Sequence, residues 1–176
     1  TTLYRSSNYG SHFDLLKSYS EDGTRFDIWA PEGERPFLIN GGNLYRMTEE
    51  NTLQHLSRFT LTIGNISSTW LTGATVNGVH KLTAMFVDAD NTHFYFSDDG
   101  GENWQKQGKL DEKPFGNNSF MASADDPSTL FLGSVNAFKS IDAGLTWTRL
   151  NRWTEYYDDP EFSLHADIPG INMHRD

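Results

Sequence analysis

Short segments in which apolar and polar residues alternate make up most of the chain. They are rich in aromatic and β-branched residues, which suit the pleated, half-buried surface of a β-sheet. Clusters of Gly, Pro, Asn and Asp separate these segments, and such clusters are typical of turns. The pattern predicts an all-β chain with strands at 25–30, 35–41, 43–47, 58–66, 83–89, 92–97, 119–124, 129–134 and 137–141.

Two segments fit this alternation less well. Residues 49–59, EENTLQHLSRF, are compatible with a short helix, and residues 11–19, SHFDLLKSY, are compatible with either a helix or a strand. Both segments are short beside the strand-rich remainder of the chain, so neither of them changes the predicted fold class.

An eight-residue pattern occurs twice, as SDDGGENW at 97–104 and as SIDAGLTW at 140–147. Both copies fit Ser-x-Asp-x-Gly-x-x-Trp, and an Asp-rich turn between two strands precedes each copy. A diverged third copy covers 37–56, where NLYRM matches NAFKS at 136–140 but the Gly and the Trp are missing. The copies lie 43 to 50 positions apart, a spacing that fits a four-stranded unit, the blade of a β-propeller.

The repeat predicts the domain organisation. We expect one domain over 1–176, a β-propeller of four-stranded antiparallel blades in the approximate units 1–36, 37–82, 83–118 and 119–176. At about 45 residues per blade this length gives about three to four blades, whereas propellers contain about four to eight. A partial propeller is therefore expected, with the rest of a larger propeller among its partners.

The repeated residues fit structural roles in a tight hairpin turn. The Asp accepts hydrogen bonds from unpaired backbone N–H groups, the Gly adopts a positive φ, and the Ser adds a local hydrogen bond. The Trp folds back over the turn and buries a large apolar area. An EF-hand calcium loop is not expected, because neither copy has its Asp-x-Asp-x-Asp-Gly spacing. The residues assigned these structural roles are Ser97, Asp99, Gly101, Trp104, Ser140, Asp142, Gly144 and Trp147.

The two octets resemble the Asp-box, also called the BNR repeat, of sialidase-like β-propellers. The stretches 130–153 and 164–171 are similar to secreted bacterial proteins of that superfamily, and the resemblance covers roughly residues 83–171. It implies that the octets lie at the blade periphery, away from the central cavity, and that the protein is secreted or on the bacterial cell surface. The superfamily holds both enzymes and proteins without activity, so the fold alone does not choose between them.

One segment combines aromatic and acidic residues in the way that carbohydrate sites do. Residues 152–162, RWTEYYDDPEF, follow the second octet. Aromatic rings stack on sugar faces and carboxylates bind hydroxyl groups, so the segment predicts a glycan platform; the alternative is a surface loop that covers a blade edge. The residues assigned to ligand binding are Trp153, Glu155, Tyr156, Tyr157, Asp158, His165 and Asp167.

The last two of these residues belong to a His-Ala-Asp segment at 165–167. In a strand, His165 and Asp167 would share one face, and with His174 they form a candidate metal site. Histidines without ligand spacing more often make ordinary hydrogen bonds, so we assign no metal and no cofactor.

Charge and composition exclude several function classes. The formal net charge is −10, which repels phosphate backbones and anionic membranes, so neither nucleic-acid binding nor membrane insertion is expected. The chain has no cysteine, which excludes disulfides, cysteine–zinc sites and thiol catalysis. No apolar run of the length needed to cross a membrane is present in the sequence.

The leading hypothesis is an exported, scaffold-like propeller segment that binds a protein or a glycan through loops at the mouth of its cavity. The alternative is part of a glycoside hydrolase, xyloglucanase-like or sialidase-like, with catalytic residues partly outside this chain. No catalytic residue is assigned, because the arginines fit no sialidase signature. The adjacent Glu155 and Tyr156 would also point to opposite faces if the segment were extended.

Overall fold

The computed structural model describes residues 2–18, 26–61 and 65–173. Within these residues the strands form three four-stranded antiparallel sheets and one two-stranded sheet. The elements are β1 (Thr2–Arg5), β2 (Asp14–Ser18), β3 (Phe26–Trp29), β4 (Phe37–Asn40), β5 (Asn43–Met47), β6 (Leu53–Arg58), β7 (Ser68–Val76), β8 (Val79–Val87), β9 (Thr92–Ser97), β10 (Gln105–Leu110), β11 (Phe120–Ala122), β12 (Leu130–Gly133), β13 (Ala137–Ser140), β14 (Thr148–Arg149) and the one-turn helix α1 (Glu155–Asp158).

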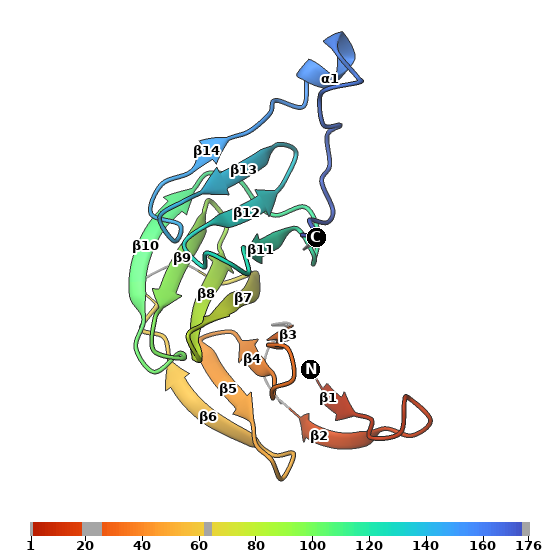
Figure 1. Cartoon of the computed structure of the whole chain (residues 1–176), viewed down its shortest axis with the longest axis vertical. Coiled ribbons are helices and arrows are strands. Elements are labelled where there is room, and N and C mark those ends of the chain that lie inside the picture. Colours follow the sequence, from red (N-terminus) through yellow and green to blue (C-terminus); the bar gives the residue numbers. More distant parts are fainter. Residues whose placement is uncertain (1, 19–25, 62–64, 174–176) are drawn as a thin grey trace.

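The sheets fan out as the blades of a partial β-propeller (Figure 1). Each four-stranded sheet is a meander whose strands are paired in chain order. The first strands, β3, β7 and β11, lie on the concave inner side, and the last strands, β6, β10 and β14, lie on the convex outer side. The predicted all-β fold with four-stranded antiparallel blades is therefore confirmed.

Apolar residues on both faces of the central sheet hold the blades together. Along β8, Leu82, Ala84 and Phe86 face the first blade, whereas Met85 faces the third. This alternation follows from the two-residue period of a strand, and burial on both faces accounts for the nearly continuous apolar run in β8. Each side of the central blade thus forms its own hydrophobic core.

In the octet turns, residues 97–104 and 140–147, the Ser and Asp side chains make corresponding hydrogen bonds in both copies. The Asp99 carboxylate accepts from the backbone N–H of Asn103 at 3.0 Å and from its side-chain amide at 2.7 Å. The Asp142 carboxylate accepts from the backbone N–H of Thr146 at 2.8 Å and from its hydroxyl at 2.6 Å. The residue before each Trp therefore also contributes to the turn, a role that the octet pattern does not specify.

The Ser and Gly of each octet close the inner part of the turn. The Gly101 N–H donates to Ser97 Oγ at 2.8 Å, and the Gly144 N–H donates to Ser140 Oγ at 2.9 Å. Both glycines have a left-handed φ, +91° and +89°. A residue with a Cβ resists this conformation, so the turn favours glycine here.

Each octet Trp connects its turn to the preceding blade. The centre of the Trp104 ring lies 4.5 Å from the centre of the Phe59 ring, and the centre of the Trp147 ring lies 4.6 Å from that of the Phe94 ring. The Trp104 indole N–H also donates to the Gly101 carbonyl at 3.0 Å, so this ring does fold back over its own turn. The octet turns therefore stabilise contacts between blades as well as single hairpins.

The predicted blade units do not coincide with the sheets. The boundary at 36/37 separates β3 from β4, and the boundary at 82/83 falls inside β8; only the boundary at 118/119 lies between two sheets. The physical reason is that the octet marks the end of the third strand of a blade, so it does not reveal where the first strand begins.

Two local segments differ from the sequence pattern. Residues 49–59, which are compatible with a short helix, form a turn followed by β6, which pairs with β5. The strand expected at 58–66 is strand only at Arg58, and residues 62–64 of it lie outside the described residues. The ambiguous segment at 11–19 contains β2.

The described part of the chain contains no helix with the length and apolarity needed to cross a membrane.

Candidate functional site

The inner strands border a groove on the concave side of the molecule. It has a volume of about 510 Å³ and lies where β3, β7, the residues before β11 and the C-terminal segment 170–172 come together. Its lining includes Asp27, Ile28, Trp29, Asn117, Asn118 and Asn172. We call this region the inner groove.

Asp27 is the acidic residue of the inner groove. Its Oδ2 accepts a hydrogen bond from the backbone N–H of Leu71 at 2.7 Å, which ties β3 to β7. Burial raises the pKa of this carboxyl group, and the hydrogen bonds from the N–H groups of Leu71 and Ile28 offset only part of that effect. Asp27 is therefore easier to protonate than an exposed aspartate.

Three asparagines bring amide groups to the same groove. Asn118 forms a parallel bridge to Gly170, and its carbonyl accepts from the Ile171 N–H at 2.9 Å. Within residues 2–18, 26–61 and 65–173, the side-chain amides of Asn117, Asn118 and Asn172 make no hydrogen bond. They can therefore offer both donors and acceptors to a ligand.

A second hollow continues past Trp29, which borders both spaces. It has a volume of about 420 Å³, and Glu32 and Glu34 lie on its rim. The Glu34 carboxylate is paired with the Arg46 guanidinium at 3.1 Å and lies 3.0 Å from His80 Nε2. The negative charge of Glu34 is thus paired with nearby side chains, whereas the side chain of Glu32 is exposed.

The aromatic residues predicted to bind a glycan lie elsewhere, around α1 at the top of Figure 1. The rings of Trp153 and Tyr157 are 6.0 Å apart at 83°, and those of Tyr156 and Tyr157 are 5.8 Å apart at 78°. The ring of His165 meets Tyr156 at 4.7 Å and 79°. Each of these three contacts is edge to face, so none of the three contacting pairs presents one flat face on which a sugar could stack.

The backbone of these residues is not extended, although an extended segment was considered for Glu155 and Tyr156 and a strand for residues 165–167. Glu155, Tyr156 and Asp158 belong to α1, and the Glu155 carboxylate accepts from the Arg152 N–H at 2.9 Å. Residues 165–167 are not a strand, and Asp167 has a left-handed φ of +66°. His174 lies outside the described residues, and the described residues hold no cluster of three metal-ligating side chains.

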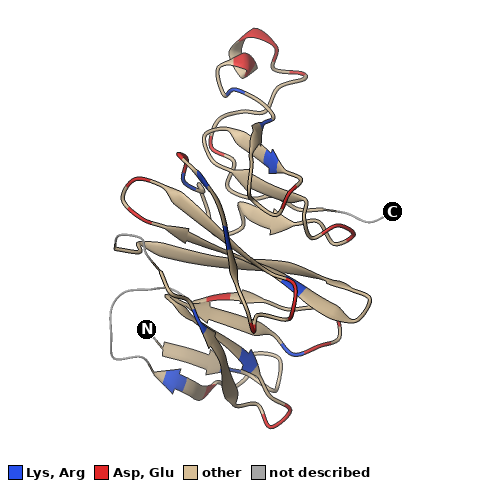
Figure 2. Cartoon of the chain, turned by 90° about the vertical axis from the view of Figure 1, so that its left-hand side faces the viewer, with Lys and Arg blue, Asp and Glu red and all other residues tan. Residues whose placement is uncertain are grey.

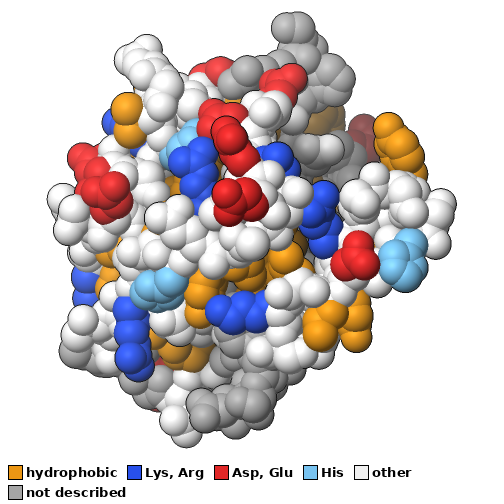
Figure 3. All heavy atoms as spheres, turned by 90° about the horizontal axis from the view of Figure 1, so that it is seen from below, with side chains coloured by type: hydrophobic (Ala, Val, Ile, Leu, Met, Phe, Trp, Pro, Cys, Tyr) orange, Lys and Arg blue, Asp and Glu red, His pale blue; other side chains and the backbone are white. Residues whose placement is uncertain are grey.

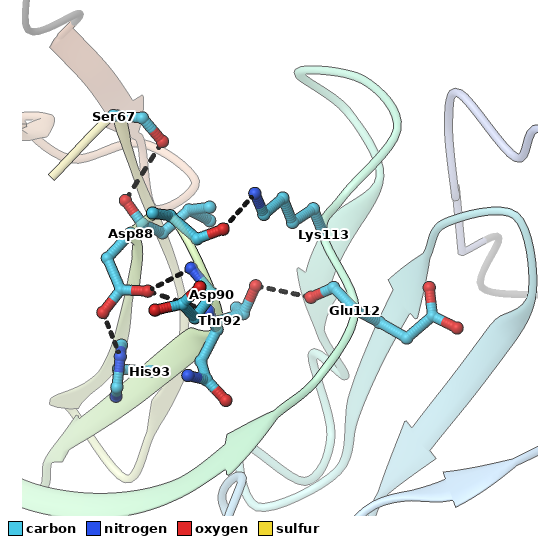
Figure 4. Close-up of polar contacts among 10 residues, drawn as sticks. Ser67, Asp88, Asp90, Thr92, His93, Glu112 and Lys113 are labelled. Carbon is cyan, nitrogen blue, oxygen red and sulfur yellow. Dashed lines mark hydrogen bonds and ion pairs between the residues drawn. The ribbon is translucent and has the colours of Figure 1, made fainter.

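A separate polar cluster surrounds the turn between β8 and β9 (Figure 4). One Asp88 oxygen accepts from the N–H groups of Asp90 and Asn91 at 2.9 and 2.8 Å, and the other lies 2.8 Å from His93 Nε2. The hydrogen bonds from the backbone N–H groups have the largest effect and that with His93 the next largest. Together they lower the pKa of Asp88 to about 2. Because every contact stabilises the turn itself, we assign this cluster a structural role.

The Asp88 cluster predicts a specific loss of stability in acid. A carboxylate whose pKa is lowered by folding stabilises the native state at pH values above its pKa in the unfolded chain. That contribution disappears as the pH falls towards its pKa in the folded chain. For Asp88 the window runs from 3.8 down to about 2. In urea titrations across this window, Asp88→Asn should show a smaller fall in unfolding free energy than the wild type.

The neighbouring Asp90 supplies the control for this measurement, because its side chain is exposed. Asp90→Asn should keep the pH dependence of the wild type. Equal pH slopes for the wild type and Asp88→Asn would show that the lowered pKa of Asp88 does not contribute to acid stability.

Sequence reasoning did not find the inner groove. Its residues come from β3, from β7, from β11 with the segment before it and from the C-terminal segment, so no short motif contains them. The only local signal was an acidic residue, Asp27, within an otherwise aromatic and aliphatic strand. The loop around Trp153 was selected because its residues are adjacent in sequence, and the structure places it away from the groove.

No protein-family model matches the chain, and no curated protein matches its sequence. Among solved structures it is similar to YCF48 from Cyanidioschyzon merolae, with a TM-score of 0.46 and 17% identity, over 72% of this chain and 37% of that chain. It is also similar to a structure of YCF48 bound to D1 peptide, with a TM-score of 0.45 and 14% identity, over 73% of this chain and 39% of that chain. The chain thus spans well under half the length of either of these two solved structures.

Proposed function

We propose that this chain is a β-propeller segment that binds a protein partner, holding an extended peptide segment of that partner in the inner groove. The observation that carries the proposal is the chemistry of the groove. It combines exposed apolar surface with amide groups that make no hydrogen bond within the described residues. Peptide ligands need both, because their backbone must be hydrogen-bonded and their side chains must be desolvated.

Each part of a peptide has a complementary group in the groove. The asparagine amides and the Asp27 carboxyl group can pair with backbone N–H and C=O groups. Ile28, whose side chain is 50% exposed, and Trp29 offer apolar contact. Glu32 on the rim of the adjoining hollow and the net charge of −10 favour a partner segment that carries Lys or Arg. The acidic residues spread over the turns in Figure 2 extend this preference across the surface.

The test uses a library of linear peptides displayed on phage, selected against the intact chain. We expect selected peptides to bind Ile28→Ser about tenfold more weakly than the wild type. Burying an Ile side chain contributes at most about 1.5–3 kcal/mol of free energy, and part of that is lost in the variant. Asn118→Ala should weaken the same peptides. Isothermal titration of the synthetic peptides measures both effects.

Val79→Ser is the matched control, because Val79 is also an exposed aliphatic residue but begins β8 directly after the β7–β8 turn and does not line the groove. It should leave peptide affinity unchanged. The proposal fails if the library yields no binder, or if the peptides it yields bind Ile28→Ser and Asn118→Ala as well as they bind the wild type.

One observation favours a second candidate, a glycoside hydrolase. Such an enzyme needs a carboxylic acid that stays protonated to donate to the leaving group, and Asp27, which lines the groove together with Trp29, has a raised pKa. Chromogenic glycosides and polysaccharides test this. Turnover that Asp27→Asn abolishes would replace peptide binding by hydrolysis as the function of the groove.

The remaining parts of the proposal come from the sequence. The resemblance of the octets to the Asp-box supports a place among the sialidase-like propellers and an exported location. Glycan binding by the loop around Trp153 stays a prediction, which Trp153→Ala tests on a glycan array. Unchanged binding in that variant would remove the loop from the function.

A further inference from the structure

A further hollow lies away from the inner strands, on the outer side between the first and the central blade (Figure 1). It has a volume of about 340 Å³. The end of β6 and the residues after it form one wall, and the first octet turn with β9 and β10 forms the other. We call this region the outer hollow. Its lining includes Arg58, Phe59, Tyr95, Glu102, Trp104 and Lys106.

Aromatic rings form the floor of the outer hollow. Tyr95 is paired with Lys106 across β9 and β10, and Trp104 lies two residues before Lys106. The three side chains therefore share the face of the central sheet that packs on the first blade. From that blade, the centre of the Phe59 ring lies 5.7 Å from that of Tyr95 and 4.5 Å from that of Trp104. Phe59 and Tyr95 are buried but Trp104 is only partly buried, so its indole is the ring that a bound molecule would contact.

One polar group in this floor lacks a partner. The Tyr95 hydroxyl is buried, and it makes no hydrogen bond to any residue that the structure describes. By contrast, the Trp104 indole N–H donates to the Ser57 hydroxyl at 3.1 Å. Burial raises the pKa of Tyr95, so its hydroxyl keeps its proton and is available as a donor. Since folded proteins leave few buried polar groups unpaired, this hydroxyl indicates a molecule that brings an acceptor into the hollow.

The third blade repeats this arrangement without the hydroxyl. Phe138 and Arg149 are paired across β13 and β14, and Phe138 has the same position relative to its octet Trp as Tyr95 has in the central blade. Phe138 is buried in the core between the central and third blades. A phenylalanine thus completes the equivalent packing between blades, so the fold does not require the Tyr95 hydroxyl.

The charged groups around the outer hollow favour an anion. Arg58 and Lys106 are exposed, and neither forms an ion pair within the parts of the chain that are described. These two cations and the Glu102 carboxylate leave a single net positive charge, in a chain whose net charge is −10. Figure 3, which views the molecule from the side of the first blade, shows hydrophobic side chains beside Lys and Arg side chains. A single positive charge next to apolar surface suits a monoanion with an apolar body better than a phosphate dianion.

We propose that the outer hollow binds a small aromatic carboxylate. The carboxylate pairs with the Lys106 ammonium and accepts a hydrogen bond from the Tyr95 hydroxyl, and the ring of the ligand packs on Trp104. Arg58 at the border adds attraction for the negative charge. These residues are separate from those of the inner groove, so the outer hollow binds its ligand whether or not the groove binds a peptide.

NMR titration of the intact, isotopically labelled chain with phenylacetate tests the proposal. We expect a dissociation constant in the low millimolar range or below, which is the affinity usual for a ligand of this size. The amide signals of the outer hollow should shift, and those of the inner groove should not. Phenylacetamide, which lacks the charge, and acetate, which lacks the ring, should each bind at least about tenfold more weakly.

Two substitutions locate the ligand within the hollow. Tyr95→Phe should weaken phenylacetate binding about tenfold, because it removes the hydrogen bond to the carboxylate, and it should leave the urea midpoint unchanged or higher. Lys106→Gln should weaken binding about threefold, as expected for an exposed ion pair. Lys109→Gln is the matched control, because Lys109 is an exposed lysine of the same strand that does not line the hollow. Its affinity for phenylacetate should equal that of the wild type.

Four results would overturn the proposal. The first is the absence of shifts in the outer hollow at about 50 mM phenylacetate, well above the expected dissociation constant. The second is equal binding of phenylacetamide, and the third is an affinity that Tyr95→Phe leaves unchanged. The fourth is a lower urea midpoint in Tyr95→Phe, which would give the hydroxyl a structural role in place of ligand binding.

Discussion

Phe94→Ala will lower the free energy of unfolding by about 3–5 kcal/mol, the usual cost of removing a buried Phe side chain. Phe94 is fully buried in β9, and its ring contacts Trp147 of the second octet turn at 4.6 Å and Phe120 of β11 at 5.9 Å. Alanine would remove the contact on which the third blade rests against the second. Because domains have about 5–15 kcal/mol of stability in total, urea denaturation should show a large shift in midpoint.

Phe162→Ala is the control for this prediction. Phe162 is 85% exposed, so its truncation should change the free energy of unfolding by less than about 0.5 kcal/mol. If Phe94→Ala also changed the urea midpoint only slightly, the core between the second and third blades would not contribute to the stability of the chain, and blade packing as described here would be wrong.

Local spacing was sufficient to predict the octet turns. The hydrogen bonds that the Ser and Asp side chains make within each turn join residues at most four positions apart, such as Ser140 with Gly144 and Asp142 with Thr146. Interactions of that range depend on the sequence of the turn and not on the rest of the fold. The same reasoning placed the diverged third copy correctly, since β5, like β9 and β13, is the third strand of its sheet.

Predictions failed where pairing partners are distant or where strands lack apolar residues. The outer strand β10, QKQGKL, is polar and borders only β9, so its sequence has no strand periodicity. The segment 49–59 has a helix-like pattern, yet its second half pairs with β5 as β6. In both cases a neighbouring strand determines the conformation, because an outer strand gains its hydrogen bonds from a partner that local propensity does not describe.

The inner groove was beyond sequence reasoning for the same reason. Asp27 and Asn118 lie far apart in the chain, and they approach each other only because consecutive blades stack side by side. The segment around Trp153 looked more like a site, since aromatic and acidic residues are adjacent there. Adjacency in sequence predicted their proximity, but it could not predict the edge-to-face orientation of the rings.

The second large effect is expected at Asp142, whose carboxylate organises the second octet turn. Asp142→Ala should lower the free energy of unfolding by about 1–3 kcal/mol, because the Thr146 N–H and the hydroxyls of Ser140 and Thr146 lose their acceptor. Burial acts to raise the pKa of Asp142, but these hydrogen bonds outweigh it and the pKa is lowered. The stabilisation is therefore present at neutral pH and decreases in acid, as the carboxylate becomes protonated.

Asp98→Ala provides the comparison for Asp142→Ala in thermal and urea unfolding. Asp98 is an exposed aspartate inside the first octet turn, but it occupies the variable position before Asp99. Its replacement removes a charge of the same sign without removing an acceptor, so the melting temperature should stay close to that of the wild type. Asp99→Ala should behave like Asp142→Ala, because the two carboxylates have equivalent partners. Similar melting temperatures for Asp142→Ala and Asp98→Ala would mean that the repeated carboxylate is not what stabilises the turn. The recurrence of the octet would then need a cause other than the stability of the blades.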